Sequence, residues 1–366
     1  MLWGRSRLPL EVYDYIIDLS REESSDERNY TTLRSCALTC RAWLARSQYN
    51  LFHTVELNTR EQLHAFSKLI DQSPRLATFV QELIIKHPDD NKPFRLMTIF
   101  PIVFARKLPR LRSLTLESPY ATPSVAPFHR IYFIAIHEFA SITDLQLFHV
   151  EFRSFSDFAR LVSNFPNLLA VECWNVSWLG HGSNPFALGG YRSRLRLNDL
   201  TVDDVELSGL AQLMHAVGSS LQHLTFGADN QWMESFVSEQ GSSMVDLTGL
   251  RSLQIPVRLD RTDFGWIKEL LSRYICSQLV RALTFSFHYG YSATPLDGAK
   301  DVLLRIQGAG MEDILVGPQF SQLKEVVFQF SSSGDTELPE GDWEDDLVSQ
   351  LPKLRLRGIA KVELTR

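Results

Sequence analysis

The chain has 366 residues, of which 44% are hydrophobic and 22% charged, and its formal net charge is −6. These proportions are those of a globular protein with ample apolar material for a core. The negative charge, with no run rich in lysine and arginine, argues against nucleic acid as a partner. Four cysteines are too few for a disulfide framework, and no two CxxC pairs exist to hold zinc. No apolar stretch is long enough to span a bilayer and no secretory signal is visible, so we expect no membrane partner and a cytoplasmic or nuclear location.

The first predicted element is a small helical domain over residues 8–52. Its opening stretch, LPLEVYDYIIDLS, has apolar residues at helical spacing at Val12, Ile16 and Leu19. Tyr13 and Ile17 widen this apolar stripe. A block of this size buries too little surface to be stable alone, so we expect a neighbour to cover it.

A polar connector over residues 20–32 leads to the stretch LRSCALTCRAWLARS. Cys36 and Cys40 are four residues apart, which on one helix is compatible with a metal or redox pair as well as with packing. No second pair of ligands lies nearby in sequence, and Trp43 continues the same stripe. We therefore interpret the stretch as a packing helix in which both cysteines act as small apolar residues.

The rest of the chain, residues 53–366, repeats an LxxLxL frame of apolar residues. Middle anchors of successive frames are mostly about 24 to 31 residues apart, the period of repeats built from a short strand and a helix. The frames are Phe52/Val55/Leu57, Val80/Leu83/Ile85, Leu111/Leu114/Leu116, Ile142/Leu145/Leu147, Leu168/Val171/Cys173, Leu197/Leu200/Val202, Leu221/Leu224/Phe226, Leu250/Leu253/Ile255, Val280/Leu283/Phe285, Leu323/Val326/Phe328 and Ile359/Val362/Leu364. We predict an α/β solenoid of about 10–11 degenerate leucine-rich repeats, with parallel strands on its inner face and helices on its outer face.

The segments between the frames have the pattern of helices. Thr59 and Gln62 stand at capping-box spacing, and Pro74 ends that segment. Further helices are expected over 154–166, 262–274, 299–310 and near 343–351, and a Gly/Ser/Asn-rich insertion over 180–194.

In such strands the anchors point inward and the residues between them point outward. Large aromatics and carboxylates share these outward positions, which is typical of a protein-binding patch. The candidate target-binding residues are Phe148, Glu172, Trp174, Asp199, Asp203 and His223. The alternative is that the 180–194 insertion covers the aromatic rings.

No catalytic motif stands out. HExxH and GxSxG are absent, the ten histidines are scattered singly, and the GAGMED stretch lacks the third glycine of a dinucleotide loop. We expect a non-catalytic protein with no cofactor and no metal.

The N-terminal stretches LPLEVYDYIIDL, LRSCALTCRAWL and SQYNLF resemble the F-box-like motif common in basidiomycete fungi, a family that often joins this motif to degenerate leucine-rich repeats. The chain departs from the repeat pattern because the asparagine that usually follows the last leucine is missing. The resemblance implies a substrate-recognition subunit of an SCF-type ubiquitin ligase, acting as a monomer within the complex. Its F-box would bind a Skp-type adaptor and its repeats an unknown target protein.

The resemblance also implies which residues contact the adaptor or support those contacts: Leu8, Pro9, Ile16, Ile17, Cys40 and Trp43. For each of them, the alternative is core packing between the helical block and the first repeat. The alternative function is a leucine-rich-repeat scaffold that binds proteins without any ubiquitin ligase.

Overall fold

A computed structural model describes residues 9–22, 27–86, 95–118, 125–126, 128–179, 195–203, 205, 213–214, 217–218, 220–227, 247–258, 264–275, 277–289, 295–332 and 343–365. The expected insertion at 180–194 and the predicted contact Leu8 lie outside these residues. The chain divides into two compact units, Met1–Gln146 and Leu147–Arg366.

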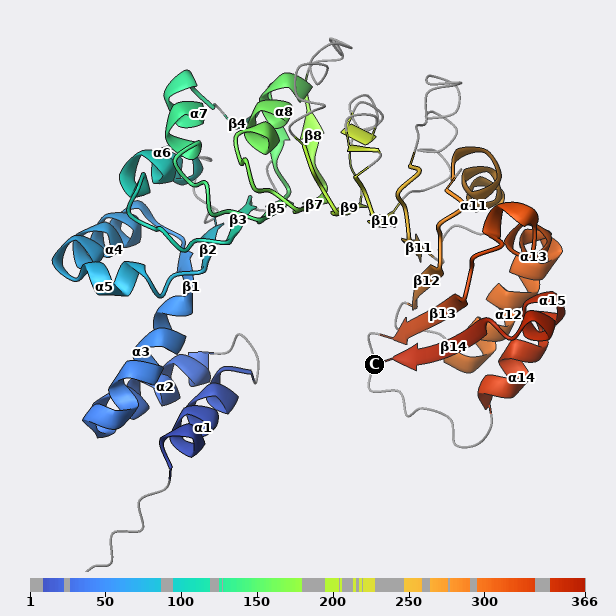
Figure 1. The fold of residues 1–366 in the computed structure, drawn as a ribbon, viewed down its shortest axis with the longest axis horizontal. Coiled ribbons are helices and arrows are strands. Elements are labelled where there is room, and N and C mark those ends of the chain that lie inside the picture. Colours follow the sequence, from blue (N-terminus) through green and yellow to red (C-terminus); the bar gives the residue numbers. More distant parts are fainter. Residues whose placement is uncertain are drawn as a thin grey trace, which may run out of the picture. The chain divides into compact units, whose positions relative to one another are not determined.

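In the first unit, three helices precede an alternation of strands and helices (Figure 1). The helices are α1 (Leu10–Glu22), α2 (Glu27–Thr39), α3 (Arg41–His53), α4 (Arg60–Gln72), α5 (Pro74–Ala77), α6 (Arg95–Phe104) and α7 (Arg130–Ile136). The strands are β1 (Thr54–Leu57), β2 (Glu82–Lys86), β3 (Ser113–Glu117), β4 (Val125–Ala126) and β5 (Asp144–Phe148), the last of which runs across the boundary between the units.

The second unit continues the alternation. Its strands are β6 (Glu151–Phe152), β7 (Ala170–Trp174), β8 (Ser177–Trp178), β9 (Asp199–Asp203), β10 (His223–Phe226), β11 (Ser252–Arg258), β12 (Ala282–Tyr289), β13 (Glu325–Ser332) and β14 (Ala360–Thr365). Its helices are α8 (Phe155–Ser163), α11 (Gly265–Glu269) with a π-helical turn η1 (Leu270–Tyr274), α12 (Pro295–Gly308), α13 (Met311–Leu315), the 3-10 turn η2 (Pro318–Phe320), α14 (Trp343–Ser349) and α15 (Pro352–Arg357).

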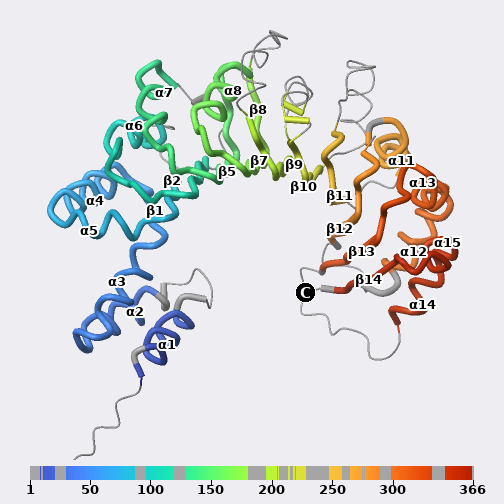
Figure 2. Tube along the Cα trace, in the orientation of Figure 1, coloured from blue at the N-terminus to red at the C-terminus, as the bar shows by residue number. Residues whose placement is uncertain are grey.

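The predicted α/β repeat fold is confirmed. Eleven strands form one sheet whose order follows the chain, β1-β2-β3-β5-β7-β9-β10-β11-β12-β13-β14, and they match the eleven predicted frames. Pairing is parallel from β1 to β3 in the first unit and from β7 to β14 in the second. The second and third anchors of every frame are at most 9% exposed. In each unit helices lie on one side of the strands, α4–α6 beside β1–β3 and α12–α15 beside β12–β14 (Figures 1 and 2).

The helix starts follow the predicted capping chemistry. The Thr59 hydroxyl accepts a hydrogen bond from the Gln62 backbone N–H (3.2 Å), and the Gln62 side chain accepts one from the Thr59 N–H (3.3 Å). This completes the capping box that begins α4. At the start of α8, the Ser154 hydroxyl accepts from the Asp157 N–H (3.3 Å).

A backbone carbonyl before most strands of the sheet ties successive repeats together. The carbonyl of Gln81, just before β2, accepts N–H bonds from Arg112 (2.8 Å) and Ser113 (3.0 Å) of the next repeat. The same two-donor arrangement recurs at the carbonyls of Arg112, Leu169, Asn198, Gln222, Arg251 and Arg281. Because only backbone atoms take part, the repeat tolerates almost any side chain at these positions.

Buried aromatic side chains stack along the sheet in the second unit. The Phe285 and Phe328 rings are 5.3 Å apart, and the Phe287 and Phe330 rings 4.9 Å apart, both pairs nearly parallel. The β12–β13 register places each pair directly opposite. Such cross-strand aromatic pairs contribute about 0.5–1.5 kcal/mol beyond the area they bury.

Three local predictions were wrong. Residues 33–47 form parts of two helices instead of one, because Cys40 has an extended backbone (φ −160°, ψ 165°) and begins α3. Cys36 is therefore buried on α2 while Cys40 is exposed, and the two thiols share no helix face. Much of the predicted connector is helical, since α1 continues to Glu22 and α2 begins at Glu27. Phe52, assigned to the first frame, lies in α3.

Candidate functional site

The N-terminal helical block is built around the inner face of α1. Ile17 is fully buried, and the Tyr13 ring lies 5.7 Å from the Trp43 ring of α3. Leu33 and Cys36 of α2 are also buried, so all three helices contribute to one small core. The inner face of α1 thus uses positions 13 and 17, one turn apart.

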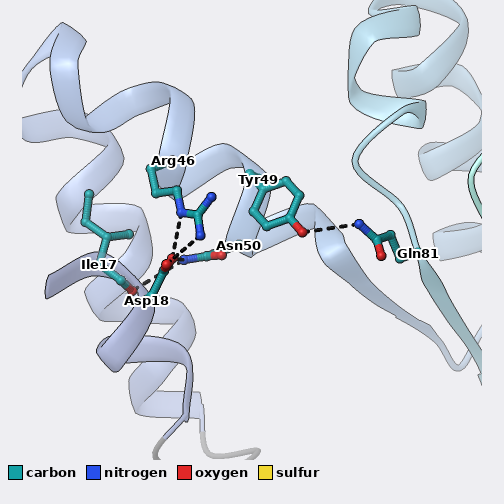
Figure 3. Close-up of polar contacts among 6 residues, drawn as sticks. All are labelled: Ile17, Asp18, Arg46, Tyr49, Asn50 and Gln81. Carbon is teal, nitrogen blue, oxygen red and sulfur yellow. Dashed lines mark hydrogen bonds and ion pairs between the residues drawn. The ribbon is translucent and has the colours of Figure 1, made fainter. Parts of the chain in front are cut away.

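A polar cluster clamps α1 to α3 (Figure 3). Arg46 binds both carboxylate oxygens of Asp18, at 2.7 Å and 2.5 Å, and this hydrogen bonding raises the pKa of Arg46. The Asn50 amide donates to Asp18 (2.9 Å) and to the Ile17 carbonyl (3.4 Å). Both charged side chains are about one-third exposed, and an exposed ion pair contributes about 1 kcal/mol or less. The clamp therefore fixes the orientation of α1 more than it stabilises the fold.

Tyr49 connects the block to the first repeat. Its hydroxyl accepts a hydrogen bond from the Gln81 side chain (3.2 Å), as Figure 3 shows, and its ring lies 6.0 Å from that of Phe79. The Gln81 backbone N–H also donates to the carbonyl of His53 at the end of α3 (2.9 Å). The block is therefore held to the repeat at β2 by side-chain and backbone contacts.

The outer face of α1 is apolar and uncovered within the described residues. Val12, Ile16 and Leu19, at i, i+4 and i+7, are 38%, 42% and 43% exposed. Other large apolar side chains of the block are exposed as well: Tyr15, Tyr30, Leu38 and Leu44. We call Val12, Tyr15, Ile16 and Leu19, which share one side of α1, the apolar face. Seven of the eighteen large apolar side chains exposed in the described chain thus come from residues 12–44, and such concentrations mark interaction sites.

The residues predicted to contact an adaptor fall into two groups. Pro9, Ile16 and Cys40 are exposed, and the Pro9 carbonyl accepts the Val12 N–H (3.1 Å) at the start of α1. Ile17 is buried, and half-buried Trp43 packs against Tyr13, so both support the exposed face. These positions do not test contact with a partner, so the adaptor role of the six residues stays a prediction.

Sequence reasoning left three members of the apolar face, Val12, Tyr15 and Leu19, out of the predicted site. Val12 and Leu19 had the necessary signal, since they share the helical spacing of Ile16. Tyr15 also has that spacing, three residues after Val12 and four before Leu19, but nothing in the sequence says which side of α1 is covered.

The six candidate target-binding residues lie at outward positions in the second unit. Phe148 is half-buried at the end of β5, and Trp174 is 40% exposed at the end of β7. The parallel registers place Trp174 opposite Asp203 of β9, and Asp199 opposite His223 of β10. The Trp174 indole N–H donates to Glu172 (2.7 Å), which fixes the ring on this surface.

A turn after each of two strands supports this surface. His149, after β5, and Asn175, after β7, have left-handed backbones (φ 57° and 51°), and their side chains are 3.1 Å apart. The His149 N–H donates to the Trp174 carbonyl (2.9 Å). The sequence offers a weak signal for such a turn, since asparagine and histidine are enriched among residues with positive φ.

No group of three or more His, Cys, Asp or Glu side chains in the described ranges is arranged to hold a metal ion. No helix in the same ranges has both the length and the apolar character needed to cross a membrane.

Comparisons with known proteins leave the family open. No family model matches the chain, and no curated protein matches it. Among solved structures, the leucine-rich repeat-containing protein LegL7 from Legionella pneumophila is similar at 12% identity with a TM-score of 0.44, over 81% of this chain and 97% of LegL7. The Rad7 and Elc1 complex in yeast is similar at 11% identity with a TM-score of 0.37, over 94% of this chain and 85% of the matched chain. Neither score is high enough to support a conclusion about function.

Proposed function

We propose that this protein is a substrate-recognition subunit of an SCF-type ubiquitin ligase, in which the N-terminal block binds a Skp-type adaptor and the repeats bind a target protein. The observation that carries the proposal is the exposed stripe of Val12, Ile16 and Leu19 on α1. Helix-in-groove recognition uses anchors at this spacing. The F-box-like LPLE start of the same helix suggests which partner covers the stripe.

The clamp on α1 is what this role requires. A docking helix that is already oriented loses less conformational entropy on binding than a mobile one. Asp18, Arg46 and Asn50 fix α1 on α3, and Tyr49 with Gln81 fixes the block on the repeat. An adaptor bound to the outer face of α1 would therefore be held firmly to the first unit.

The test is adaptor binding by purified full-length chains. Ile16→Asp/Leu19→Asp places two charges in the stripe and should weaken binding of a Skp-type adaptor by about a hundredfold or more, since each anchor contributes about 1.5–3 kcal/mol when buried. Ile131→Asp/Ile134→Asp on α7 is the matched control, because these side chains are 55% and 61% exposed and share the three-residue spacing. Equal adaptor affinity in wild type and the stripe variant would reject the proposal.

The alternative, a repeat scaffold without a ubiquitin ligase, predicts that no chain binds the adaptor. The target surface can be tested separately in cells of the source organism. Proteins that accumulate when the gene is deleted should return to normal with wild type but not with Trp174→Ala. If Trp174→Ala restores their levels fully, the outward surface of β7 is not the target site.

A further inference from the structure

The strand β14 stands last in the sheet order of the described residues. Within the described residues it pairs with β13 alone. Figures 1 and 2 show it beside the C-terminus as the last strand of the series. An edge of this kind presents unpaired N–H and C=O groups that can pair with another strand.

The ladder geometry identifies which groups are unpaired. The Val326 N–H of β13 donates to the Ile359 carbonyl (2.8 Å), and Val326 is in register with Ala360. In a parallel ladder, residues that point toward a neighbour alternate with residues that point away. Lys361 and Glu363 therefore direct their backbone groups toward β13, and Ala360, Val362 and Leu364 direct theirs to the open edge.

The edge sequence AKVEL is complementary to itself when two copies run antiparallel. With Val362 opposite its counterpart, Ala360 lies opposite Leu364, and all the edge-pointing groups of these residues pair. The same register places Lys361 opposite Glu363 of the second copy, twice by symmetry, at the positions where side chains come closest. Shifting the centre to Ala360 or Leu364 loses both opposite-charge pairs.

The side chains of β14 are suited to such an addition. Val362 and Leu364 are 4% and 8% exposed, so its apolar side is already covered by this chain, and α14 and α15 pack against the strand. Lys361 and Glu363 are exposed on the other side, and Lys361 forms an ion pair with Glu325 of β13 that holds its ammonium group at the sheet surface. A partner strand therefore needs to supply backbone groups and complementary charge, without a new apolar core.

We propose that the open edge of β14 binds the β14 of a second copy of this chain, antiparallel and centred on Val362, to give a two-fold symmetric dimer. Two-fold symmetry is the commonest arrangement of soluble oligomers, and it requires a surface that is complementary to itself. The proposal departs from the monomer expected from the sequence. It does not depend on the ubiquitin-ligase proposal.

A pair of charge variants tests the register. Lys361→Glu alone places Glu opposite Glu363, and Glu363→Lys alone places Lys opposite Lys361, so each variant should self-associate about tenfold more weakly than wild type by sedimentation velocity. A mixture of the two variants restores both opposite-charge pairs and should associate as tightly as wild type. Lys324→Glu, an exposed position just before β13, is the control and should behave as wild type.

Residue-resolved hydrogen exchange of the wild type is the second measurement. At concentrations that favour the dimer, the amides of Val362 and Leu364 should become protected, whereas those of Lys361 and Glu363 should be protected at every concentration. A chain that stays monomeric at all concentrations, variants that self-associate as wild type does, or a mixture that does not recover, would overturn the proposal.

Discussion

Substitutions of the two adjacent isoleucines on α1 should separate an effect on folding stability from an effect on adaptor binding. Ile17 is fully buried and Ile16 is 42% exposed, although both are apolar and share one helix turn. Ile17→Ala removes three carbons from the core of the block. At about 0.8 kcal/mol for each buried carbon, with a cavity contribution added, the cost is about 3 kcal/mol. Ile16→Ala removes the same carbons from a partly exposed site and should cost about 0.5 kcal/mol or less.

Native-state hydrogen exchange of the purified chain measures both changes. A loss of about 3 kcal/mol makes local opening roughly a hundredfold more frequent, so peptides from α1 and α3 should exchange about a hundredfold faster in Ile17→Ala. Ile16→Ala should exchange like wild type and lose adaptor affinity instead. If both variants exchange alike, or if Ile17→Ala leaves exchange unchanged, the assignment of the two faces of α1 is wrong.

Three further predictions concern single side chains. Glu312 is only 3% exposed and accepts two backbone N–H groups at the start of α15 (3.0 and 3.1 Å). Glu312→Ala should therefore destabilise α15 and β14 by about 2–3 kcal/mol, which faster amide hydrogen exchange in these elements would show. Unchanged hydrogen exchange would refute this role. Thr59→Ala removes half of the capping box of α4 and should cost about 1 kcal/mol in urea unfolding, whereas Thr59→Ser should cost little; equal losses would argue against the cap. Burial raises the pKa of the Cys173 thiol, so Cys173 should resist a thiol reagent at pH 8 in the folded protein and react after unfolding. Exposed Cys40 should react at once, and rapid labelling of Cys173 in the folded protein would contradict its burial.

The repeat was predictable from the sequence because the same physical constraint acts on every strand. An anchor such as Leu114 must enter a core that the preceding and following repeats also enter, so its spacing is fixed to the residue. The helix boundaries were equally clear where a proline or a capping residue such as Thr59 marks them. The backbone carbonyls that tie the repeats together, those of Gln81 and its equivalents, could not be predicted from the sequence. Every residue carries the same carbonyl group, so the residue type does not show which ones are used.

The break at Cys40 shows a second limit. No glycine or proline marks it, and the apolar steps of three and four continue through it from Cys36 to Trp43. The periodicity in the sequence continues although Cys36 is buried on α2 and Cys40 is exposed at the start of α3. A pattern of this kind indicates that residues are helical, and it does not indicate that they belong to the same helix.

The apolar face shows the limit that matters most for function. On α1 the core residues Tyr13 and Ile17 lie next to the exposed residues Val12, Ile16 and Leu19, so the apolar stripe of the helix is wider than its core alone requires. A periodic pattern of apolar residues indicates a core or an interface alike, because both bury apolar side chains away from water. Only the fold separates the two: α3 covers Ile17, and no described residue covers Ile16. The excess apolar character of this short helix is therefore the signal on which the proposal of a covering partner rests.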